Sequence, residues 1–201
     1  MYNRQVTPGR EDADLIAAVL GGDRDAFGEL VGRYQEVAFR AAYLITRDAG
    51  LAEEAAQDGF IRAHQSLRGF RIGEPLRPWL LRIVTNLALN QVRGRSRRLR
   101  LLERAGVLAE RRAEPPAEDA VFANDRQRQL WQAIRELSED DRVVLYLRYF
   151  LDLPEREIAT VIGKAPGTVK SRLNRAGGRL RGVIETRYPG LRPAAEGGGG
   201  G

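Results

Sequence analysis

The 201-residue chain lacks the residue types on which many enzymes and metal sites depend. It has no cysteine, which excludes disulfide bonds, thiolate metal ligands and cysteine nucleophiles. Its single histidine, His64, excludes a site built from several imidazoles, and we expect this residue to be structural. No apolar stretch has the length of a membrane span, and the N-terminus lacks a signal-peptide core. We therefore expect a cytoplasmic protein without membrane insertion, which is not an enzyme and holds no cofactor.

Charge, in contrast, is abundant and unevenly distributed. The formal net charge is +6, and among the basic residues only Lys164 and Lys170 are lysine. Residues 11–63 carry eleven acidic and five basic side chains, whereas residues 93–112 carry eight arginines and two glutamates. Residues 164–187 carry seven basic side chains and one glutamate. This segregation indicates that different surfaces meet different partners, and that one of these partners is a polyanion.

Residues 153–181 are typical of a helix-turn-helix whose second helix binds DNA. Pro154 suits the first turn of a helix, Gly163 suits its end, and Pro166 suits the start of the next helix. An inward apolar stripe on the second helix consists of Val169, Leu173 and Ala176. The outward side chains are donors for phosphates and base edges, namely Thr168, Lys170, Ser171, Arg172, Asn174, Arg175 and Arg179. The alternative is an amphipathic hairpin with a solvated basic face.

In the N-terminal half, the apolar spacing predicts a short helix ending at Leu20, a second and longer helix, and a third helix over residues 49–67. Either of two aspartates is available to cap each of the first two helices: Asp12 or Asp14, then Asp23 or Asp25. The expected buried side of the third helix consists of Leu51, Ala55, Phe60, Ile61 and Leu67. Gly59 interrupts this helix at a cost near 1 kcal/mol.

The other side of the third helix carries Glu54, Gln57 and Asp58 at helical spacing, as one exposed acidic patch. A metal or acid–base site is disfavoured here, because no histidine or further carboxylate cluster converges on the patch. A solvated helix face is the simplest interpretation, and a docking surface for a basic helical partner is the other.

A loop rich in glycine and proline over residues 69–78 precedes a fourth helix that is expected to end at Arg98. The buried stripe of this helix consists of Leu80, Ile83, Val84, Leu87 and Ala88. A different face combines amides for base edges with arginines for phosphates, namely Arg82, Asn86, Asn90, Arg93 and Arg97. Trp79, at the start of the helix, is either a core residue or a flat surface on which an unpaired base stacks.

A change of composition marks a domain boundary, because the chain turns from arginine-rich to acidic around Pro115 and Pro116. Beyond it, a helix begins at Asp125, and Ser138 is expected to cap the next helix with Asp141 as a capping-box acid. The expected fold class is all-α, with two small helical domains joined by a flexible linker. The expected parts are a disordered N-terminus over residues 1–11, domains over residues 12–98 and 125–187, a linker over residues 99–124, and a disordered tail over residues 188–201.

The order of these parts resembles the extracytoplasmic-function sigma factors, which belong to the sigma-70 family of bacterial RNA polymerase. The resemblance rests on four stretches in order: DAFGELVGRYQEVAFRAAYLI, AEEAAQDGFIRA, RPWLLRIVTNLALNQVRGRSRR and LSEDDRVVLYLRYFLDLPEREIATVIGKAPGTVKSRLNRAGGRLR. It implies that residues 12–98 form sigma region 2 and that residues 125–187 form the helix-turn-helix of region 4.

The resemblance also implies partners and site residues. The partners are core RNA polymerase, promoter DNA and an anti-sigma factor. The residues implied in docking on the clamp helices of the polymerase β′ subunit are Glu54, Gln57 and Asp58. The residues implied at the −10 element are Arg71 in the base-capturing loop, Trp79, Arg82, Asn86, Asn90, Arg93 and Arg97. Those implied at the −35 element are Thr168, Lys170, Ser171, Arg172, Arg175 and Arg179, and the first helices of region 4 would contact the β flap.

Two other functions are compatible with parts of the sequence. A helix-turn-helix regulator that binds duplex DNA without polymerase explains residues 153–181, but it leaves the Trp79 helix and the acidic patch without a use. An anti-sigma or adaptor protein that binds only protein is disfavoured by the two basic faces. A steep salt dependence of DNA binding separates this last class from the other two.

Overall fold

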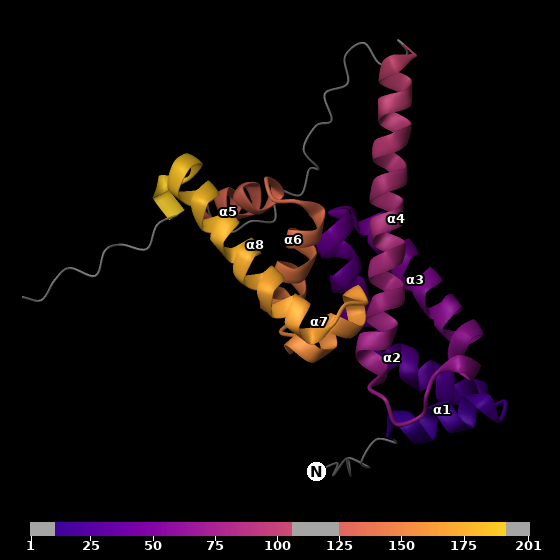
Figure 1. The fold of residues 1–201 in the computed structure, drawn as a ribbon. Coiled ribbons are helices and arrows are strands. Elements are labelled where there is room, and N and C mark those ends of the chain that lie inside the picture. The colour runs from indigo at the N-terminus through magenta and orange to yellow at the C-terminus, as the bar shows by residue number, and fades with distance from the viewer. Residues whose placement is uncertain (1–10, 106–124, 192–201) are drawn as a thin grey trace, which may run out of the picture. The chain divides into compact units, whose positions relative to one another are not determined.

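The computed structural model describes residues 11–105 and 125–191 (Figure 1). The chain divides into two compact units between Gly94 and Arg95. All regular elements within the described residues are helical, as the all-α prediction requires. The expected disorder of residues 1–10, the linker over residues 106–124 and the tail from residue 192 lie outside the described residues. Over the described ranges, no helix combines the length and the apolar character needed to span a membrane.

The first unit is formed by α1 (Asp12–Leu20), α2 (Arg24–Thr46), α3 (Ala49–Ser66), the 3₁₀ turn η1 (Leu67–Gly69) and the part of α4 (Leu76–Arg104) that ends at Gly94. Asp23 caps α2, because its Oδ1 accepts hydrogen bonds from the N–H groups of Asp25 and Ala26. Asp48 caps α3 in the same way by accepting from the N–H of Leu51. Helix α4 continues past the expected end at Arg98 and ends at Arg104.

The prediction that Asp12 or Asp14 caps α1 is wrong. Both residues lie in the first turn of α1, and the capping position belongs to Glu11, whose side chain makes no capping hydrogen bond. Asp12 instead joins α1 to α2, since its carboxylate accepts hydrogen bonds from Arg33 and Tyr34. Burial raises the pKa of Tyr34, so its hydroxyl remains protonated and able to donate.

Two apolar clusters form the core of the first unit. One lies between α2, α3 and α4, and the other joins α1, the first half of α2 and the segment before α4. Trp79 is half-buried between the two clusters, and its ring lies 4.9 Å from that of Phe70. Ile61, predicted to be buried, is 55% exposed. Its expected place is taken by small residues of α3, namely Ala52, Ala56 and Ala63, which let the helices approach closely.

Gly59 explains how closely α3 and α4 approach. A Cβ atom at this position would lie 2.5 Å from Cγ2 of Val84, which is fully buried in α4. Valine in a helix has one strongly preferred rotamer, so Val84 cannot easily turn away. The sequence suggests only a helix-weakening residue at position 59, whereas the structure shows that any larger residue would separate the two helices.

The second unit is formed by α5 (Asp125–Arg135), α6 (Glu139–Leu145), the π-helical turn η3 (Tyr146–Phe150), α7 (Glu155–Ile162), α8 (Pro166–Arg187) and the 3₁₀ turn η4 (Pro189–Leu191). Trp131 of α5 packs on Tyr146 and Phe150 of η3. Because η4 continues the folded chain to Leu191, the predicted start of a disordered tail at residue 188 is too early.

The local signals of the helix-turn-helix are mostly confirmed. Gly163 ends α7 in the left-handed region with φ of 65°, and Pro166 occupies the first turn of α8. Pro154 precedes α7 as its capping residue and does not lie inside the first turn. Ser138 caps α6 by accepting from the N–H of Asp141. The carboxylate of Asp141, expected in a capping box, instead pairs with Arg179 of α8.

We predict that Gly59→Ala lowers the free energy of unfolding of the first unit by about 1–3 kcal/mol, because the added methyl group overpacks the contact with Val84. Trp79 fluorescence in a Trp131→Phe background, followed through a urea titration, reports on this unit alone because the chain has 2 tryptophans.

Gly28→Ala and Gly32→Ala are matched controls for Gly59→Ala. Both glycines lie in α2, and a Cβ atom at either position meets nothing within 4 Å. These changes should stabilise the unit by up to about 1 kcal/mol through helix propensity. A Gly59→Ala protein as stable as the two controls would contradict the steric interpretation.

Candidate nucleic-acid and protein interfaces

The outer face of α8 carries polar and basic side chains at the start of the helix. Lys170, Ser171, Asn174 and Arg175 are exposed, while Val169 and Ala176 on the opposite side are fully buried. The guanidinium of Arg175 donates back to the carbonyl of Ser171 at 3.2 Å, which orients it along the helix. This arrangement gives α8 the hydrogen-bond donors and acceptors that base edges and phosphates require in a major groove.

Two of the predicted outward arginines, Arg172 and Arg179, lie on the flank of α8 that faces α6. Arg172 pairs with Asp140 at 2.9 Å, and Arg179 pairs with Asp141 at 2.5 Å. The Asp141 side chain is only 5% exposed, whereas the Asp140 side chain is 62% exposed. The first pair therefore lies open to solvent at its acidic end, and the second anchors α8 to α6. Thr168, predicted on the same surface, is half-buried.

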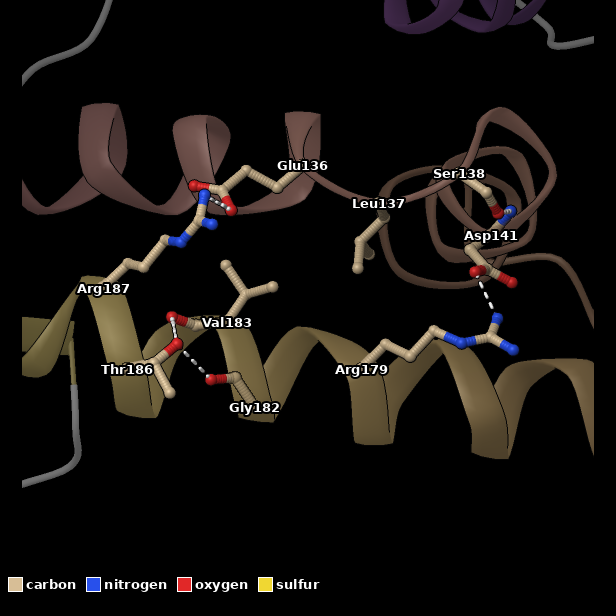
Figure 2. A pocket seen from close by; sticks show the side chains of 9 residues that line it. All are labelled: Glu136, Leu137, Ser138, Asp141, Arg179, Gly182, Val183, Thr186 and Arg187. Carbon is tan, nitrogen blue, oxygen red and sulfur yellow. Dashed lines mark hydrogen bonds and ion pairs between the residues drawn. The ribbon is translucent and has the colours of Figure 1, made fainter.

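A third ion pair extends this anchoring toward the C-terminal end of α8. Arg187 pairs with Glu136 at 2.6 Å, and the same glutamate accepts a hydrogen bond from the hydroxyl of Tyr188. An open groove of about 640 Å³ lies between the Arg179–Asp141 pair and the Arg187–Glu136 pair, and Leu137 and Val183 point into it (Figure 2). An ion pair at either end of this groove holds α8 on the corner between α5 and α6.

The exposed face of α4 carries a row of amide and arginine side chains. Arg82, Asn86, Asn90, Arg93 and Arg97 are all exposed, as the sequence predicts. They are spaced by three or four residues, so they follow one face of the helix. On the opposite face, Leu80, Val84 and Ala88 are buried. Leu81 and Thr85 are also buried, and the sequence analysis missed both. Thr85 is compatible with burial because its hydroxyl donates to the carbonyl of Leu81.

The loop before α4 places exposed side chains beside the start of this row. Arg71 is 86% exposed and lies 3.9 Å from Glu74, a surface pair that contributes little to stability. Gly73 has φ of 97°, which permits the tight turn from Arg71 to Glu74. An open pocket of about 560 Å³ lies between this turn and α1 and α2, and Asp12, Arg33 and Tyr34 line its polar side.

Trp79, at the start of α4, is a packing residue of the first unit. Its indole is half-buried and packs against both apolar clusters of the first unit. The sequence left open whether Trp79 is a core residue or a stacking surface for an unpaired base. The contacts within the chain favour the core residue. Replacement of Trp79 would disturb the core as well as any stacking on a base.

The acidic patch on α3 is present and extends to an apolar neighbour. Glu54 and Gln57 are exposed, Asp58 is half-buried, and Gln57 donates to Glu53 at 3.3 Å. Ile61, two turns after Glu54 on the same face, is 55% exposed. The sequence analysis placed Ile61 on the buried side of α3, because an isoleucine in a helix is normally assigned to the core. In the described part of the chain, no group of three or more histidine, aspartate or glutamate side chains is placed to hold a metal ion.

Comparison with known families assigns both units. Residues 30–98 match the family Sigma-70 region 2, and residues 127–180 match the family Sigma-70, region 4. The first range contains the α3 patch and the α4 row, and the second contains the helix-turn-helix.

Comparison with individual proteins extends the similarity over most of the chain. The RNA polymerase sigma-H factor of Pseudomonas aeruginosa is 34% identical over 83% of this chain and 90% of its own length. The ECF RNA polymerase sigma factor SigW of Bacillus subtilis is 32% identical over 83% of this chain and 92% of its own length.

A solved structure has the same fold. The sigma factor RpoE from Bartonella quintana, crystallised with the anti-sigma factor NepR, matches with a TM-score of 0.60 and 27% identity, over 80% of this chain and 98% of that one. Two domain families in the same order, relatives similar over nearly their full lengths, and a shared fold lead to one conclusion: this chain belongs to the extracytoplasmic-function group of the sigma-70 family of RNA polymerase sigma factors.

Proposed function

We propose that this chain binds core RNA polymerase and directs it to promoters, with its second unit on the −35 duplex and its first unit on the −10 element. The observation that carries the proposal is the presence of both sigma regions, in family order, in one chain. The chain contributes binding energy and sequence selection in this role, and the polymerase performs the chemistry. We infer a cytoplasmic location, because the polymerase and the promoter are found there.

For the −35 element, we infer that the exposed outer face of α8 contacts base edges and phosphates through Lys170, Ser171 and Arg175. Asn174 joins this group because it is exposed beside them. Arg172 can reach a phosphate by leaving Asp140, since the acidic partner is largely exposed to water. Arg179 and Thr168 serve chiefly to position the helix, because one pairs with a buried carboxylate and the other is half-buried.

For the −10 element, we infer that the α4 row contacts DNA from Arg82 to Arg97 and that the adjacent loop receives an unpaired base. Asparagine amides pair with base edges, and arginines neutralise phosphates. The exposed turn at Arg71 and the open pocket beside Gly73 support a base-receiving loop. Trp79 supports this surface by fixing the start of α4 on the core.

For core polymerase, we infer that the α3 face with Glu54, Gln57 and Asp58 docks on the β′ clamp helices, and that the second unit contacts the β flap. Ile61 is the apolar member of the α3 face, and its side chain is exposed where a partner could cover it. Acidic groups around an exposed aliphatic side chain fit a basic, amphipathic helical partner. We further propose an anti-sigma factor as a partner, by analogy with the Bartonella quintana complex.

We expect run-off transcription from a promoter library to depend on this protein when core polymerase is supplied. Aligned start regions of the transcripts would then identify the −35 and −10 sequences. Core polymerase alone and the protein alone are the controls. Specific retention of duplex DNA by the protein alone, without any dependent transcript, would instead establish a regulator that acts without polymerase.

We predict that Glu54→Lys combined with Ile61→Ala weakens binding to core polymerase at least tenfold, because it removes charge complementarity and an apolar contact from the α3 face. Glu36→Lys combined with Val37→Ala, on α2, is the control. It makes the same change of charge, but it removes less exposed apolar area because Val37 is half-buried. Fluorescence anisotropy of labelled protein titrated with core polymerase measures both. Equal affinities of the two double variants would remove α3 from the docking surface.

We predict that Arg175→Ala chiefly reduces initiation at the −35 element, whereas Arg179→Ala chiefly lowers the stability of the second unit. Arg175→Ala should reduce −35-dependent initiation and change the free energy of unfolding by less than about 0.5 kcal/mol, because it is a surface substitution. Arg179→Ala should lower the free energy of unfolding of the second unit by about 1–3 kcal/mol. This is less than for a fully buried pair, since the Arg179 side chain is 55% exposed.

The two effects are separated by Trp131 fluorescence in a Trp79→Phe background and by run-off assays on promoters with intact or scrambled −35 elements. Asp141→Asn should reproduce part of the Arg179→Ala destabilisation, because it removes the other charge of the pair. An Arg179→Ala protein of unchanged stability, with a defect on the intact −35 element alone, would place Arg179 among the DNA contacts.

A further inference from the structure

The ion pair between Arg172 of α8 and Asp140 of α6 differs from the two pairs that anchor α8. In those two pairs the acidic side chains, Asp141 and Glu136, are only 5% and 25% exposed. Asp140 lies in the first turn of α6, and its side chain is 62% exposed, whereas the Arg172 side chain is 24% exposed. A pair with such an open acidic end contributes little to stability, so anchoring alone is a poor explanation for it.

Arg172 lies at the edge of the outer face of α8. Ser171, directly before it, and Arg175, one turn after it, are both exposed on that face. A helix that places its outer face in a major groove brings its flanks toward the phosphates that border the groove. The planar guanidinium group is well suited to phosphate, because it binds through paired N–H donors. A phosphate and the Asp140 carboxylate therefore compete for the same side chain.

We propose that Asp140 limits the affinity of the −35 surface for DNA by competing with a backbone phosphate for Arg172. This inference rests on the proposed function and assigns a role in it to Asp140. Arg172 binds the phosphate only after its 2.9 Å hydrogen bond to Asp140 is broken. Binding then leaves the Asp140 carboxylate without this cation, near a polyanion. Both changes oppose binding.

The competition acts on DNA of any sequence, because a phosphate contact carries no base information. Ion pairs between exposed side chains correspond to factors of about 1.5 to 5 in an equilibrium constant, which sets the scale of the effect. The base contacts of the outer face remain as they are and continue to select the −35 sequence. The pair therefore weakens retention of the unassembled chain on bulk DNA and leaves more of it available to core polymerase.

The first test is Asp140→Asn in the full-length protein, which removes the competing charge and keeps the size of the side chain. We expect a gain in affinity of about 1.5- to 5-fold at low salt, measured by fluorescence anisotropy on labelled duplexes with an intact or a scrambled −35 sequence. The gain should shrink as the salt concentration rises, because salt screens exposed charges. A gain of affinity cannot result from a folding defect.

Asp125→Asn is the matched control for Asp140→Asn. It also removes an aspartate from the first turn of a helix, in this case α5, and this aspartate also pairs with an arginine, since Arg128 lies 3.2 Å away. Arg128 is not part of the α8 surface, so the affinity should stay near that of the wild type. Equal gains from the two substitutions would overturn the inference, because they would show an effect of net charge alone.

A double-mutant cycle with Arg172→Ala tests whether Asp140 acts through Arg172. We expect Asp140→Asn to gain less affinity in the Arg172→Ala background than in the wild type. Equal gains in both backgrounds would overturn the inference, because Asp140 would then repel DNA directly. A loss of affinity on Asp140→Asn would also overturn it, because the pair would then hold Arg172 in its DNA-binding position.

The inference and the proposed function fail in different assays, because these binding measurements need no polymerase. An affinity unchanged by Asp140→Asn, together with protein-dependent run-off transcripts, would overturn the inference alone. The expected cycle in the absence of any dependent transcript would overturn the proposed function and leave the competition for Arg172 standing.

Discussion

The close approach of α3 to α4 at Gly59 and Val84 is the constraint on which the first unit depends. A side chain at position 59 would collide with Cγ2 of Val84 at 2.5 Å, so only glycine permits this packing. With the two helices in contact there, the acidic face of α3 and the polar row of α4 both point away from a shared core. One small residue thus determines the spacing of two surfaces with opposite charge, one suited to a protein and the other to DNA.

In the second unit, a strongly basic helix, α8, is held on a small core. Helix α8 buries few side chains completely, among them Val169 and Ala176. Three arginines on its flank instead pair with acidic residues of α6 and of the turn between α5 and α6. Two of these pairs lie on either side of the groove that Leu137 and Val183 line (Figure 2). These pairs neutralise part of the charge on α8 and leave its outer face available. The basic residues of one helix are thereby divided between anchoring and recognition.

Charge segregation along the chain translates into segregation among helices. The acidic N-terminal part supplies the α3 face, and the arginine-rich stretch supplies the C-terminal half of α4. Because α4 is a single helix to Arg104, its arginines repeat at helical spacing and form one continuous row. A protein that joins a polymerase to DNA needs such separate surfaces, since a mixed surface would favour neither partner. Membership of the sigma-70 family explains why one chain carries a surface for protein and a separate surface for DNA.

The sequence by itself determined the helical fold, the cap at Ser138 and the breaks at Gly163 and Pro166, because these depend on local periodicity and backbone preference. It left the cap of α2 open between Asp23 and Asp25, and it indicated the two sigma regions through the resemblance of four stretches in order. It also determined which α4 residues share an exposed face. Only the tertiary structure decided that Ile61 is exposed, that Gly59 is a contact residue, and that Asp141 pairs with Arg179 across 38 positions of sequence. These properties depend on which helix lies opposite, and helical spacing within one segment carries no information about the neighbouring helix.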